Sequence, residues 1–245
     1  MAPAPFRDVR RGLRAQWAIL ITAFAHADPA APSRVGGWSV ADLEQHLVHT
    51  GESLGRLAAG PTADGPVTGI DGWATALPGL GEQIAREVVA GTAAPSLAEM
   101  APATLGVLDT ADPDRPVAQW TGTHRLGDAT LFRLVEAVVH ALDLPDPPTA
   151  DRGAERIVVR ALAGLLAGRA PGRSVELRVP PAAAVQLIGG PRHTRGTPPG
   201  VVETDPATFL RLATGRMAWS AAVERGQLRA SGERTDLSEL LPLLS

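Results

Sequence analysis

The sequence predicts a helical bundle followed by a smaller α+β domain. Up to residue 143, apolar residues recur at the three- and four-residue spacing of amphipathic helices. The segment "DLPDPPTAD", residues 143–151, contains three prolines and three aspartates, which is typical of a linker. Beyond it, short stretches of alternating apolar residues lie between helical ones, as in a mixed sheet. We therefore expect two domains, over residues 1–145 and 151–245.

The first domain is expected to be an up-and-down bundle built from amphipathic helices. The second helix has Ser39 as a plausible N-cap, and Asp42 suits the positive end of the helix dipole. Residues 111–128 form a long connector with some extended character. The helices are expected at about 6–27, 39–59, 73–91, within 95–110, and at 128–143.

The second domain alternates helical and extended patterns. Asp205 is a good N-cap, Pro206 suits the first helical position, and Gly215 marks the C-terminal end of that helix. Other helices are expected within 154–168 and 236–244, and strands at 174–179, 183–190, 200–204 and 227–232. The pattern favours an α+β fold.

Composition excludes several classes of function. The net charge is −3, so there is no basic field for nucleic acid. No apolar run reaches the roughly 18–20 residues of a membrane span. We expect a cytoplasmic protein. We also expect it to be a monomer or a homodimer. Cys, Lys and Tyr are absent, which excludes a cysteine nucleophile, a thiolate zinc site and Schiff-base chemistry. All 23 basic residues are Arg, so an arginine alone is weak evidence for a site.

One pattern points to metal chemistry. In "LFRLVEAVVHALDL", Glu136 and His140 lie four residues apart on one face of an apolar helix. His46 lies on the helix that begins "WSVADLEQHLVH". Two histidines and a carboxylate on facing helices can hold a catalytic zinc or ferrous ion with open coordination positions. An internal Glu–His ion pair would also satisfy these groups, so the pattern leaves both interpretations open.

The remaining histidines differ in their claim to this site. His49 follows His46 by three residues and is an alternative ligand. His124 precedes the last helix of the bundle and could reach the mouth of the site. His26 and His193 look like ordinary helix-end or loop residues.

These motifs resemble a known family. "GGWSVADLEQHLVH" resembles the second-helix motif of DinB-like four-helix bundles, and "RLVEAVVHALDL" resembles the Glu-x-x-x-His-x-x-Asp-Leu motif of the mycothiol-dependent maleylpyruvate isomerase family. "FLRLATGRMAWSAAVERGQLRASG" is similar to the hallmark of the sterol-carrier-like C-terminal domain of that family. The resemblance implies a DinB-like four-helix bundle followed by a sterol-carrier-like α+β domain. It covers about Trp17 to the C-terminus.

The resemblance also implies a mechanism and site residues. Zn²⁺, or another divalent metal, would be bound by His46, Glu136 and His140, which selects His46 over His49. The thiol of mycothiol would replace the missing cysteine and attack a small electrophile, giving S-transfer or cis–trans isomerisation. Arg216 corresponds to an arginine near the active site and would bind a substrate carboxylate. Mycothiol, like the composition, suits an actinobacterial host.

Two other functions remain open from the sequence. The protein could be a carrier whose second domain holds an apolar ligand, with a structural or vestigial metal site in the bundle. The small residues of "ELRVPPAAAVQLIGG" could line such a pocket or simply pack between strands. A regulator that senses metal or thiol is the third possibility, and no DNA-binding motif supports it.

Overall fold

The computed structural model describes residues 3–79, 95–190 and 200–244. The chain forms two compact units, one of residues 4–154 and one that contains residues 155–245. Among the described residues, no helix combines the length and apolar character needed to cross a membrane.

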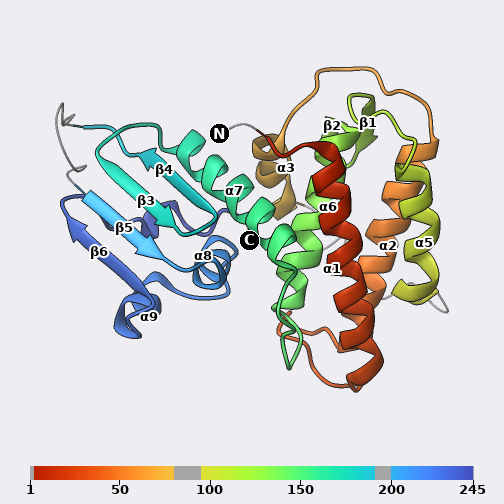
Figure 1. The fold of residues 1–245 in the computed structure, drawn as a ribbon, viewed down its shortest axis with the longest axis horizontal. Coiled ribbons are helices and arrows are strands. Elements are labelled where there is room, and N and C mark those ends of the chain that lie inside the picture. Colours follow the sequence, from red (N-terminus) through yellow and green to blue (C-terminus); the bar gives the residue numbers. More distant parts are fainter. Residues whose placement is uncertain (1–2, 80–94, 191–199, 245) are drawn as a thin grey trace. The chain divides into compact units, whose positions relative to one another are not determined.

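The first unit is a four-helix bundle with a hairpin and a short helix attached (Figure 1). The bundle helices are α1 (Phe6–His26), α2 (Val40–Ala59), α5 (Leu97–Leu108) and α6 (Leu126–Ala141). The attached elements are α3 (Ile70–Ala76), the 3₁₀ turn η1 (Leu77–Gly79), and the antiparallel strands β1 (Pro116–Gln119) and β2 (Gly122–Arg125).

Each bundle helix packs against two others, α1 and α2 each contacting α5 and α6. The apolar stripes expected from the sequence are buried here, as Leu13 and Trp17 on α1 and Leu43 and Leu47 on α2 illustrate. Between α2 and α5 the Met100 side chain packs against Gly51, where a larger residue would collide with it. The bundle core is therefore continuous across all four helices.

The up-and-down order predicted for this bundle is wrong. Glu44 near the start of α2 accepts a hydrogen bond from the backbone N–H of Leu97 at the start of α5, and Gly55 faces Thr104 further along both helices. Consecutive bundle helices α2 and α5 thus run parallel. A parallel pair needs a crossover, and the chain between Ala59 and Leu97 provides one that includes α3.

Other expected elements differ in position. The helix expected at about 73–91 begins earlier, at Ile70, and its part beyond Gly79 lies outside the described residues. The connector with extended character contains the β1–β2 hairpin. The helix expected at 128–143 is α6, which begins at Leu126 and ends at Ala141.

The second unit is a four-stranded sheet with helices. Its strand order is β4-β3-β5-β6, with β3 and β5 parallel and the two outer pairs antiparallel. Val175, Leu177 and Val179 of β3 are buried while Glu176 and Arg178 between them are partly exposed, so one sheet face carries the core. The elements are α7 (Arg152–Arg169), β3 (Val175–Val179), β4 (Ala183–Leu187), β5 (Gly200–Thr204), α8 (Pro206–Ala213), α9 (Trp219–Glu224) and β6 (Leu228–Gly232).

The amphipathic helix expected at 236–244 is absent from the described residues. Only a 3₁₀ turn, η2 (Ser238–Leu240), forms there. Leu241 is extended, with φ −122° and ψ 147°, because the residue before a proline is driven out of the helical region. Pro242 therefore overrides the apolar spacing. The short helix α9 also has no counterpart among the elements expected from the sequence.

Candidate functional site

Two histidines from different helices of the bundle lie together. His46 on α2 is 5% exposed, and its ring packs edge-on against that of His140 on α6, with centroids 5.0 Å apart and planes at 84°. Two imidazoles that ligate one zinc ion at a tetrahedral angle, with metal–nitrogen bonds of about 2.0–2.1 Å, place their centroids about 5 Å apart. The spacing of this pair therefore suits a shared divalent ion.

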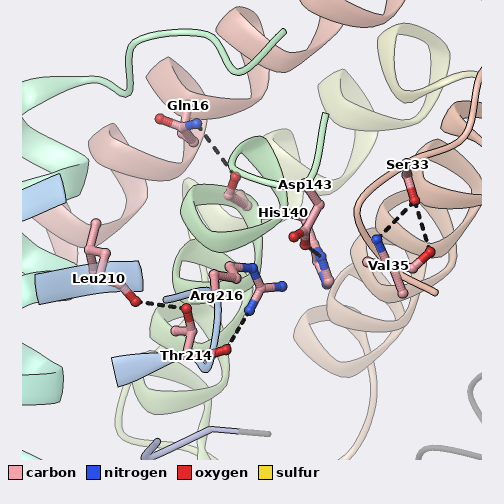
Figure 2. A network of polar contacts seen from close by, with 9 residues as sticks. Gln16, Ser33, Val35, His140, Asp143, Leu210, Thr214 and Arg216 are labelled. Atoms are coloured by element: carbon pink, nitrogen blue, oxygen red, sulfur yellow. Dashed lines mark hydrogen bonds and ion pairs between the residues drawn. The ribbon is translucent and has the colours of Figure 1, made fainter. Parts of the chain in front are cut away.

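A buried carboxylate orients His140. Its Nδ1 lies 2.8 Å from Oδ2 of Asp143, a residue that is 1% exposed (Figure 2). A carboxylate oxygen can only accept, so Nδ1–H donates and Nε2 is the atom left for another partner. A histidine held by a carboxylate through its second nitrogen is the usual arrangement of a metal-ligating imidazole.

The environment of His46 favours its neutral form. Burial lowers the pKa of His46 well below its usual value of 6.5, and the charges of His140, Arg133 and His49 lower this pKa further. The His46 ring contacts those of Trp38 and His140. A neutral imidazole is the form that binds metal ions.

Glu136 is engaged by an arginine. Its Oε1 lies 2.9 Å from Nη2 of Arg133, three residues earlier on α6. Its Oε2 is buried and has no hydrogen-bond partner. The described residues contain no group of three or more His, Cys, Asp or Glu side chains that could together hold a metal ion. The structure thus pairs His46 with His140 and leaves Glu136 on Arg133, one turn away.

The chemistry of these residues fits a divalent metal. Nitrogen donors from two imidazoles and oxygen from a carboxylate are the ligand types of catalytic zinc. The orphaned Glu136 Oε2 is a second indication, since a buried polar oxygen without a partner is costly. For Glu136 to be the third ligand of the metal, its Oε2 must face the histidine pair.

The other histidines have different environments. His49 is exposed, one turn beyond His46. His124, which was expected to reach the mouth of the site, is instead fully buried against Phe132, and its two ring nitrogens are bonded to the carbonyl of Thr68 and the hydroxyl of Thr121. With both nitrogens occupied, His124 is a structural residue. His26 is an exposed residue at the end of α1, and His193 lies outside the described residues.

Arg216 belongs to the second unit. It follows α8 at a turn where Gly215 has φ +71°, a value that favours glycine. Its backbone N–H donates to the carbonyl of Arg211 at 2.8 Å. Its Nη1 donates to the carbonyl of Thr214 at 2.9 Å (Figure 2). The predicted Gly-Arg turn is therefore present, while the substrate role of Arg216 stays a prediction.

A groove of about 620 Å³ lies elsewhere on the first unit. Its walls come from the C-terminal half of α1 and from residues 144–148, and they include Ile19, Leu144 and Pro147. None of His46, Glu136 and His140 lines it. The groove is therefore separate from the histidine pair.

Arg133 and Asp143 had no role in the site expected from the sequence. Asp143 belongs to the Glu-x-x-x-His-x-x-Asp-Leu pattern, and its position three residues after His140 was the available signal. Arg133 gave no signal, because arginine is the only basic residue type in this chain.

Comparison with known proteins agrees with this architecture. Residues 10–145, more than half of the chain, match the family model described as the mycothiol maleylpyruvate isomerase N-terminal domain. Residues 151–243 match the model described as a bacterial SCP ortholog. Comparison with curated protein sequences finds no match.

Two solved structures share the fold over nearly the whole chain. Both are crystal structures of the mycothiol-dependent maleylpyruvate isomerase, one of them a histidine-to-alanine mutant. They are 16% identical to this chain and cover 95% of it and 97% of their own length, with TM-scores of 0.59 and 0.58. The predicted fold class, a helical bundle followed by an α+β domain, is confirmed. This chain belongs to the family defined by the mycothiol maleylpyruvate isomerase N-terminal domain.

Proposed function

We propose that this protein is a metal-dependent enzyme that uses a low-molecular-weight thiol, mycothiol, as its nucleophile. The reaction is S-transfer to, or cis–trans isomerisation of, an electrophilic small molecule. The observation that carries the proposal is the pairing of buried His46 with His140, which Asp143 orients, in a chain without cysteine. Family membership and the fold shared with an isomerase support the thiol and the reaction class.

The residues of the bundle have separate tasks in this proposal. His140 would hold the ion through Nε2, because Asp143 occupies Nδ1. His46 supplies a second neutral nitrogen, and Glu136 supplies a carboxylate oxygen that reduces the net charge of the site. When bound, a divalent ion provides the positive charge that keeps a thiol ionised near neutral pH. The bundle itself then excludes water around His46, which is nearly fully buried.

Isomerisation by a thiol needs no other covalent group. The thiolate adds to a conjugated double bond, the resulting single bond rotates, and the thiolate leaves as the trans double bond forms. If the carbanion formed by addition instead takes up a proton from solvent, the thiol stays bound to carbon and the result is S-transfer. We retain Arg216 as a proposed partner for a substrate carboxylate, which a guanidinium binds by two parallel hydrogen bonds.

A carrier for an apolar ligand is the second candidate. The match of residues 151–243 to a bacterial SCP ortholog favours it. A carrier would retain lipid on purification and would show no thiol-dependent turnover.

The test compares turnover with and without the thiol. Purified protein is assayed on a maleyl-type acid and on chlorodinitrobenzene, with mycothiol, with a different thiol, and with none. We expect turnover only with a thiol, because the chain has no sulfur nucleophile of its own. Turnover without any thiol would refute the mechanism, and no turnover with every thiol would favour the carrier.

A further inference from the structure

Two candidate ligands on α6 are each held by a charged residue three positions away. Asp143 binds Nδ1 of His140 at 2.8 Å, and Arg133 binds Oε1 of Glu136 at 2.9 Å. In both cases one polar atom of the candidate ligand is occupied. The second polar atom of each ligand, Nε2 of His140 and Oε2 of Glu136, takes no part in these two contacts. The four residues Arg133, Glu136, His140 and Asp143 form one column along the same face of the chain.

The Arg133–Glu136 ion pair is largely shielded from solvent, which distinguishes it from ordinary surface pairs. The side chains are 11% and 14% exposed. On α1 the pair Arg11–Asp8 has the same three-residue separation and the same 2.9 Å distance, but Arg11 is 79% exposed. An exposed ion pair restrains its side chains weakly, whereas a carboxylate shielded from solvent is held in place by its counter-ion.

One oxygen of Glu136 is left without a partner by the ion pair with Arg133. Oε2 of Glu136 is buried without a hydrogen-bond partner, although its twin Oε1 is satisfied. Glu136 lies one turn before His140 on the same face of α6, the direction toward which side chains on a helix lean. The histidine ring in turn packs on His46. A cation at the histidine pair would give the orphaned oxygen the partner that it lacks.

We propose that Arg133 is a positioning residue for Glu136, as Asp143 is for His140. By holding Oε1, the guanidinium presents Oε2 to a divalent cation bound at His46 and His140. Arginine suits this role because its planar group is always charged and binds a carboxylate in a fixed geometry. The inference rests on the proposed function, because it requires the metal to bind there.

The test is the affinity for Zn²⁺, measured by competition with a chromogenic chelator at one fixed pH. Arg133→Gln should weaken Zn²⁺ binding by about 10- to 100-fold, which is the usual effect of losing a partner that orients a ligand. Arg133→Lys keeps the charge and should fall between Arg133→Gln and the unmodified protein. Arg11→Gln is the matched control and should bind Zn²⁺ like the unmodified protein. Circular dichroism of each variant shows that it is folded.

A double-mutant cycle separates positioning from a general structural role. In the Glu136→Gln background, Arg133→Gln should weaken Zn²⁺ binding no further, because the group that it positions is gone. Equal affinity of Arg133→Gln and the unmodified protein would overturn the inference and leave the proposed function standing. Tighter binding by Arg133→Gln would also overturn it, since Arg133 would then compete with the metal for Glu136. Failure of the unmodified protein to bind Zn²⁺ would refute both proposals.

Discussion

At the scale of single residues, the candidate site depends on how charged and polar side chains are neutralised inside the bundle. His46 is kept neutral by burial, His140 is bound by Asp143, and Glu136 is bound by Arg133. Spacing in the sequence indicated Glu136 and His140, and the family resemblance selected His46 on a second helix. The structure pairs the two histidines. Arg133 could not be identified from the sequence, because local spacing does not reveal which cation pairs with the Glu136 carboxylate.

The lowered pKa of His46 predicts a pH-dependent loss of stability. The unfolded chain takes up a proton at this residue near pH 6.5, whereas the folded chain does so only at lower pH. The contribution of neutral His46 is therefore complete above about pH 6.5 and is lost as the pH falls below it, by up to about 1.4 kcal/mol per pH unit. We expect His46→Gln to remove this part of the slope.

Urea unfolding of chelator-treated protein at pH 7.5 and 5.5 measures that difference. His26→Gln is the control, because His26 is exposed at the end of α1. A slope for His46→Gln equal to that of the unmodified protein would contradict the assignment.

At the scale of elements, α2 is secured at both ends, and this fixes the turn that carries His46. Ser39 and Asp42 form a complete capping box, in which the Ser39 side chain accepts from the Asp42 N–H and the Asp42 side chain accepts from the Ser39 N–H. At the other end, the guanidinium of Arg115 donates to four carbonyls, those of Leu57, Ala58, Gly60 and Pro61. The N-cap was predictable from a local motif, whereas the Arg115 contacts join residues more than 50 positions apart.

Removing the Arg115 side chain should destabilise the fold. Arg115→Met leaves the last carbonyls of α2 without these donors, and we expect the free energy of unfolding to fall by about 1–3 kcal/mol. Arg56→Met is the matched control on the same helix, since Arg56 makes an exposed ion pair with Glu52 at 3.6 Å. Its effect should stay within about 0.5 kcal/mol. Equal losses in both variants would argue against a capping role for Arg115.

Two element predictions failed for reasons that lie outside local periodicity. The apolar spacing at 236–244 predicted a helix, but Pro242 forces Leu241 into an extended conformation. The parallel direction of α2 and α5 depends on contacts such as Glu44 with Leu97, which no single-segment pattern contains. Periodicity thus identified the bundle helices but could not order them in space.

At the scale of the whole molecule, the chain combines a bundle and an α+β unit that match two different family models. The family matches end and begin at residues 145 and 151, and the compact units divide at residue 154. Pro145, Asp146 and Thr149 in the intervening segment are exposed and belong to no helix or strand. The proline-rich composition indicated this connection from the sequence.

We predict that limited proteolysis cleaves first at 145–150, because exposed connections without regular structure are the preferred sites of cleavage. A protease of broad specificity and mass spectrometry of the first fragments test this. Two fragments that meet at 145–150 are expected. First cleavage within 128–143, most of which forms the largely buried helix α6, would count against the proposed boundary.

We propose that His46, Glu136 and His140 together hold one divalent metal ion in the bundle. The most direct measurement is the metal content of protein purified without a nickel column, determined by mass spectrometry for the unmodified chain, His140→Ala and His49→Ala. We expect about one equivalent of metal per chain in the unmodified protein and in His49→Ala, because His49 is exposed, one turn beyond the pair. His140→Ala should fall well below one equivalent. Full retention by His140→Ala, with the loss in His49→Ala instead, would contradict the account.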